Sequence, residues 1–74
     1  EFQVFPNPAA DRVELRFTEV PQILIVRNLH GQELQRITQL SSQQFVDLQT
    51  IPAGVYLLEA RYEQRRSTTR LVKQ

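Results

Sequence analysis

The stretch Val55-Tyr56-Leu57-Leu58-Glu59-Ala60-Arg61-Tyr62 is the longest run of alternating side chains in the 74-residue chain. Successive side chains of a β-strand point to opposite faces of the sheet. One face of this segment carries Tyr56, Leu58, Ala60 and Tyr62. The other face carries Val55, Leu57, Glu59 and Arg61. The alternation predicts that residues 55–62 form a principal strand of the core.

Shorter runs of the same kind lie on both sides of this segment, and residues that favour turns separate them. The further predicted strands are Phe2–Phe5, Arg12–Phe17, Ile23–Val26, Gln32–Ile37, a short one through Val46 and Leu48, and Ser67–Lys73. The predicted turns include Pro6-Asn7-Pro8, Asn28-Leu29-His30-Gly31 and Ile51-Pro52-Ala53-Gly54. Proline removes a backbone donor, and Asn and Gly tolerate positive φ, so a strand ends at each of these turns.

The patterns of three strands also predict where they lie. Arg12–Phe17 alternates between apolar and charged residues, as a half-buried antiparallel strand does. Ile23–Val26 is apolar on both faces, which favours the middle of a sheet. In Gln32–Ile37 the apolar residues Leu34 and Ile37 are three positions apart and fall on opposite faces, which indicates a bulge or an exposed edge.

Seven short strands with turns every 8 to 12 residues, and no helical spacing, predict an all-β fold. We expect a small immunoglobulin-like antiparallel β-sandwich of about seven strands, formed by residues 1–74 as one domain. A chain of this size buries only about 60% of its unfolded surface, and no cysteine is present to add a disulfide. The chain begins inside a predicted strand without a methionine, so we expect it to be the end of a larger secreted protein.

The sequence contains few side chains that could take part in catalysis. We therefore predict that the protein is not an enzyme and that it has no catalytic, cofactor-binding or metal-binding residue. There is one histidine, His30, and its turn position predicts that it is exposed. Asp11, Glu14 and Glu19 are close in sequence, but the strand pattern separates them as solvated acids. The two glycines lie more than twenty residues apart, which excludes a glycine-rich phosphate loop.

The C-terminal part of the chain is locally basic. Residues 61–74 contain five basic residues against one acid, and residues 1–60 contain four arginines against seven acids. Basic residues interleaved with aromatics are typical of nucleic-acid binding, but Tyr56 and Tyr62 both fall on the predicted core face. We therefore expect no nucleic-acid partner.

Three segments, taken in order, resemble a known family. They are Val4-Phe5-Pro6-Asn7-Pro8-Ala9, Asn28-Leu29-His30-Gly31-Gln32, and Leu48 with Ile51-Pro52-Ala53-Gly54-Val55-Tyr56. Together with the ending Thr69-Arg70-Leu71-Val72-Lys73, they are similar to the C-terminal sorting domains of type IX secretion cargo proteins of Bacteroidetes, in the type A family. Asn28 stands where the family has Asp, Arg27 where an aromatic is common, and Gln74 lies one residue beyond the pattern.

The resemblance implies that the domain is a sorting signal and not an enzyme. Such a domain follows an upstream cargo domain, passes through the periplasm, and engages the outer-membrane type IX translocon and its shuttle protein. A sortase-like peptidase then removes it, and the cargo reaches the cell surface or the medium. The resemblance names Arg70, Leu71, Val72 and Lys73 as candidates for translocon recognition. It gives a structural role to Pro6, Asn7, Pro8, Asn28, Gly31, Pro52, Gly54 and Tyr56.

The physical expectation is that the terminal strand lies at a sheet edge with unpaired backbone groups, which a receptor extends by strand addition. Removal of the last five residues is then expected to abolish export without unfolding the domain. The same edges permit a strand-exchanged dimer in isolation. The alternative function is a non-catalytic sandwich module of a secreted enzyme or adhesin that binds glycan or protein and is never removed.

Overall fold

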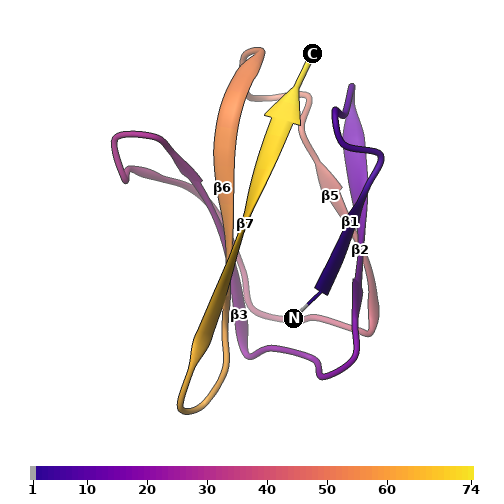
Figure 1. Cartoon of the computed structure of the whole chain (residues 1–74), viewed down its shortest axis with the longest axis vertical. Coiled ribbons are helices and arrows are strands. Elements are labelled where there is room, and N and C mark those ends of the chain that lie inside the picture. The colour runs from indigo at the N-terminus through magenta and orange to yellow at the C-terminus, as the bar shows by residue number, and fades with distance from the viewer. Residues whose placement is uncertain (1) are drawn as a thin grey trace.

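Seven strands in two antiparallel sheets make up the part of the chain that the computed structural model describes, residues 2–74. The strands are β1 (Phe2–Phe5), β2 (Arg12–Phe17), β3 (Ile23–Asn28), β4 (Glu33–Ile37), β5 (Gln43–Asp47), β6 (Gly54–Arg61) and β7 (Arg66–Lys73). The sheets have the orders β1-β2-β5 and β4-β3-β6-β7, and they face each other (Figure 1). The predicted antiparallel sandwich of about seven strands is confirmed.

The core between the sheets is built from alternate residues of the strands. In β6 the inward residues Tyr56, Leu58 and Ala60 are buried, as is Tyr62 just beyond the strand. Val13, Leu15 and Phe17 of β2 face them from the other sheet and are also buried. The core faces that the alternation predicts for these two strands are confirmed.

β3 and β4 show the central strand and the irregular edge strand that the sequence predicts. β3 lies between β4 and β6, and its Leu24, Ile25 and Val26 are buried. β4 is the edge strand of this sheet, and its register with β3 shifts between Val26 and Arg27. This irregularity allows the unevenly spaced apolar residues of β4 to pair with a regular neighbour.

The turn between β3 and β4 is held by the side chain of Asn28. Its Oδ1 accepts hydrogen bonds from the backbone N–H groups of His30 (3.0 Å) and Gln32 (2.9 Å). Gly31 has a φ of 85°, which a residue with a Cβ rarely adopts. The hydrogen bonds of Asn28 and the positive φ of Gly31 are those of a tight turn.

The approach to β6 is held by a hydrogen bond from the hydroxyl of Tyr56 to the carbonyl oxygen of Pro52. This contact joins the turn before β6 to a side chain of the core. Gly54, which lies between them, has a φ of 156°. These three motif residues therefore set where β6 begins.

Candidate functional site

The terminal strand β7 lies at one edge of the four-stranded sheet. Along its whole length it pairs with β6, from Gly54 opposite Lys73 to Arg61 opposite Arg66. In Figure 1 it runs upward in yellow to the C-terminus, with β1 of the other sheet nearby. The expected position of the terminal strand at a sheet edge is therefore observed.

The four candidate recognition residues divide between the two faces of β7. Leu71 points inward and is fully buried in the core. Lys73 is half-buried, and its Nζ donates hydrogen bonds to the carbonyl oxygens of Leu48 (2.7 Å) and Ile51 (2.6 Å). Arg70 is exposed, and Val72 is half-buried beside it on the outer face. Only Arg70 and Val72 thus present their side chains away from the core.

The turn after β1 covers the upper part of the β7 edge. The Nδ2 of Asn7 donates to the carbonyl oxygen of Arg70 (3.0 Å), and its Oδ1 accepts from the N–H of Val72 (3.0 Å). The N–H of Ala9 donates to the carbonyl oxygen of Val72 (2.8 Å), and that of Gln74 donates to Ala9 (2.8 Å). Ala9 also forms a parallel bridge with Lys73. The first turn and the last strand are therefore joined.

This contact restricts the expectation that the terminal strand has unpaired backbone groups, because the groups from the Arg70 carbonyl to Val72 are not free. The Arg70 carbonyl and both backbone groups of Val72 are already bonded. The reason is that an asparagine amide has a donor and an acceptor side by side, as a neighbouring strand has. Deletion of the last five residues would also remove Leu71, which belongs to the core, so we now expect that deletion to destabilise the domain.

Two prolines give the first turn its shape. Pro6 and Pro8 flank Asn7, are exposed, and follow cis peptide bonds. Neither proline has an N–H to donate, so the Asn7 side chain and Ala9 make the hydrogen bonds to β7. The resemblance implied a structural role for Asn7 but not this contact, and the only signal in the sequence was an amide placed between two prolines.

A second amide joins the two sheets at the opposite side of the sandwich. The Nε2 of Gln35, in β4, donates to the carbonyl oxygen of Asp47, in β5, at 2.9 Å. β4 and β5 are the edge strands on that side. On each side of the sandwich, a side-chain amide therefore bonds to the backbone of an edge strand of the opposite sheet. Nothing in the sequence pattern indicated this role for Gln35.

The outer face of the four-stranded sheet contains a buried carboxylate among arginines. Glu59 is only 5% exposed and pairs with Arg27 (3.0 Å), Arg61 (3.2 Å) and Arg66 (3.3 Å). Burial opposes its ionisation, but hydrogen bonds from Arg27 and Arg61 outweigh burial and hold the pKa of Glu59 below its usual value. Arg27, noted above as a departure from the resemblance, donates to Glu59 and also to the carbonyl oxygen of Gly31.

The two tyrosines are not available to stack on bases. Tyr56 and Tyr62 are 5% and 7% exposed. The guanidinium of Arg65 covers the ring of Tyr62, with its central carbon 4.0 Å from the ring centroid. The interleaved arginines and tyrosines therefore do not form an open stacking surface.

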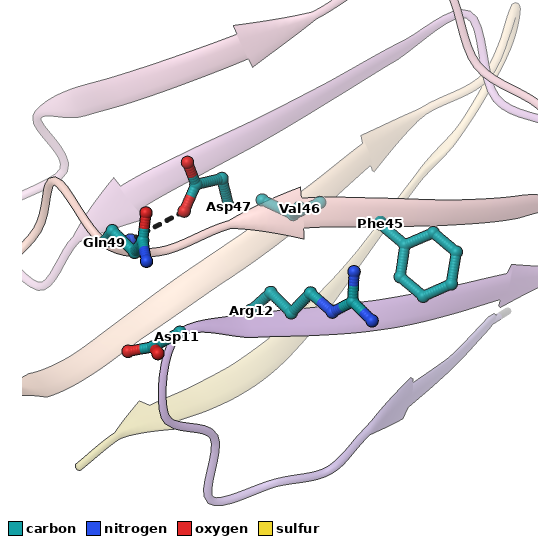
Figure 2. Close-up of a pocket in the computed structure, with 6 residues that line it drawn as sticks. All are labelled: Asp11, Arg12, Phe45, Val46, Asp47 and Gln49. Carbon is teal, nitrogen blue, oxygen red and sulfur yellow. Dashed lines mark hydrogen bonds between the residues drawn. The ribbon is translucent and has the colours of Figure 1, made fainter.

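A shallow hollow lies on the three-stranded sheet beside β2 and β5 (Figure 2). Asp11, Arg12, Phe45, Val46, Asp47 and Gln49 line it. The Arg12 guanidinium lies over the Phe45 ring, 4.7 Å from its centroid, and the Gln49 N–H donates to Asp47. Its lining has neither a histidine nor a nucleophilic side chain next to a base, so the hollow offers no evident catalytic chemistry.

The other candidate polar groups do not gather into a site. His30 is exposed at the tip of the turn between β3 and β4. Across residues 2–74, no group of three or more His, Cys, Asp or Glu side chains is placed to hold a metal ion. Residues 2–74 contain no helix that is long and apolar enough to cross a membrane.

Comparison with known proteins places these features in a family. A family model described as "Secretion system C-terminal sorting domain" matches residues 3–74, which is nearly the whole chain. No curated protein matches the chain. The matched span includes both the first turn and the strand β7 to which it bonds.

Proposed function

Because the chain belongs to the type IX secretion C-terminal sorting domains, we propose that it directs an attached cargo across the outer membrane and is then removed by a sortase-like peptidase. The cargo lies upstream of β1. It passes through the periplasm with the domain folded, engages the outer-membrane translocon and its shuttle protein, and ends at the cell surface or in the medium. The domain itself performs no catalysis.

The observation that best supports this proposal is the arrangement of β7. The strand lies at a sheet edge, and Asn7 and Ala9 hold its terminal residues in a fixed position. A recognition element on a rigid strand loses little conformational entropy on binding. We propose that Arg70 and Val72 contact the translocon directly, and that Leu71 and Lys73 hold the strand in the orientation that this contact requires.

A fusion experiment tests the sorting function. Residues 1–74 are joined to the C-terminus of an inert periplasmic reporter in a type IX secreting bacterium. We expect the reporter outside the cell with the domain removed. A reporter that stays in the periplasm with an intact, folded domain would contradict the proposal. That result would favour the alternative, a glycan-binding or protein-binding module. A reporter that reaches the surface with the domain still attached would contradict the removal step alone.

A further inference from the structure

The lower half of the β7 edge has backbone groups that face away from the sheet. Both backbone groups of Val72 point away from β6, because they bond to Asn7 and Ala9. In an antiparallel pair, every second residue has the same orientation, so Thr68 and Arg70 also point away from β6. Of the four backbone groups of Thr68 and Arg70, only the Arg70 carbonyl is bonded, to the amide of Asn7. The Arg70 N–H and both groups of Thr68 therefore form an open edge.

No other strand covers this open edge among residues 2–74. Over Arg66–Leu71, the only strand that pairs with β7 is β6, and the bridge to Ala9 lies higher, at Lys73. The side chains of Thr68 and Arg70 are exposed. An edge strand with free N–H and C=O groups is a template for an added strand.

The net charge around the open edge is positive. β7 contains Arg66, Arg70 and Lys73 and no carboxylate. The outer face to which Arg66 and Arg70 belong has five arginines, Arg27, Arg36, Arg61, Arg66 and Arg70. It has two glutamates, Glu33 and Glu59, which already pair with Arg36 and with three other arginines. No ion pair among the described residues includes Arg70, so this face has uncompensated positive charge.

The positive charge distinguishes between two candidate binding partners of the open edge, a second copy of the chain and an acidic segment. If a second copy paired with β7 in antiparallel fashion about Thr68, Arg66 of each copy would lie opposite Arg70 of the other. Like charges directly opposite each other destabilise a strand pair. An extended segment with acidic side chains would instead place a carboxylate beside each arginine. The edge therefore fits an acidic segment better than it fits itself.

We propose that the open edge of β7, from Arg66 to Arg70, binds an extended acidic segment of a partner protein by strand addition. The inference rests on the proposed function, since the partner is then a component of the secretion machinery. Backbone hydrogen bonds at Thr68 and Arg70 supply the affinity, and Arg66 and Arg70 select acidic side chains on the outer face. Asn7 limits the register, because the edge above Arg70 is already occupied.

Binding to a synthetic peptide tests the edge directly. The probe is a short fluorescein-labelled peptide of alternating glutamate and valine, titrated with residues 1–74 at low salt, and the comparison peptide has lysine in place of glutamate. We expect the acidic peptide alone to bind, with slower hydrogen exchange at the amides of Thr68 and Arg70. Equal binding of both peptides, or unchanged exchange at these amides, would overturn the proposal.

Two pairs of variants separate the edge from general effects. Thr68→Pro removes a donor that faces the open edge, not β6, and Thr68→Val keeps that donor. We expect Thr68→Pro to weaken peptide binding about tenfold and Thr68→Val to leave it unchanged. Arg70→Gln is expected to weaken binding severalfold, whereas Arg36→Gln, at the other edge of the same sheet, is not. Thermal unfolding checks that all four variants are folded. If the two folded variants of either pair bind the peptide equally well, the proposal is overturned.

Export of the reporter fusion distinguishes this inference from the sorting function. We expect fusions with Thr68→Pro and Arg70→Gln to remain in the periplasm while those with Thr68→Val and Arg36→Gln are secreted. If both edge variants are secreted as well as the unmodified domain, the edge proposal fails and the sorting function stands. If the fusion with the unmodified domain is not secreted, the proposed sorting function is wrong, whether or not the acidic peptide binds. A concentration-dependent dimer that Thr68→Pro abolishes would show that a second copy is the occupant, and would overturn the proposal.

Discussion

The side-chain oxygen of Asn7 accepts a hydrogen bond from the backbone N–H of Val72 at 3.0 Å, although the two residues are 65 positions apart in the chain. This bond joins the turn after the first strand to the last strand. The same amide donates to the carbonyl oxygen of Arg70. One side chain therefore holds the turn after β1 against the strand that is proposed to meet the translocon.

Asn7→Ala is expected to lower the free energy of unfolding by about 1–3 kcal/mol, because two hydrogen bonds to β7 are lost. Urea unfolding measures this change, and hydrogen exchange at the Val72 amide locates it. Gln35→Ala is the control, because it removes an amide from the opposite side of the sandwich. Two results would contradict the role of Asn7 in holding β7: faster exchange at the Val72 amide in Gln35→Ala, or an unchanged exchange rate at that amide in Asn7→Ala.

Leu71→Ala is expected to cost about 2–5 kcal/mol of stability, because Leu71 is fully buried in the core. Val72→Ala, one residue further along, is the matched control, since Val72 is half-buried on the outer face. Urea unfolding of both variants makes the comparison. The account of β7 would be wrong if the two substitutions cost the same or if Val72→Ala cost more.

The pairing of Glu59 predicts a dependence of stability on pH. The folded pKa of Glu59 is held below its ordinary value of 4.5, so its ionised form stabilises the fold above that pH. This contribution is lost as the pH falls through the lower, folded pKa. The difference in unfolding free energy between the unmodified chain and Glu59→Gln should be about 1–3 kcal/mol at neutral pH and should shrink in acid.

Glu63→Gln is the control for this pH experiment, because Glu63 is exposed in the turn after β6 and belongs to no ion pair among the described residues. Chemical unfolding over a series of buffers from neutral to acid pH gives both differences. A gap between the unmodified chain and Glu59→Gln that stays constant with pH would show that Glu59 does not have the inferred ionisation.

Alternation predicted most of the fold, because it reports which face of a strand is buried. The core faces of β2 and β6, the central place of β3 and the irregular pairing of β4 all follow from local patterns. The contact of Asn7 with β7 could not be predicted in this way, because it joins distant segments of different sheets. The burial of Glu59 was also missed, since it needs arginines from β3 and β7 as well as from β6.

The central claim is that the outward side of β7 is the signal read during export. The most direct test is secretion of the reporter fused to residues 1–74 with the double change Arg70→Glu and Val72→Glu, compared with the fusion that has Arg36→Glu. The account predicts that the double variant stays in the periplasm with a folded domain, as resistance to limited proteolysis would show, while the control is secreted and processed. Secretion of both fusions at the level of the unmodified domain would contradict it.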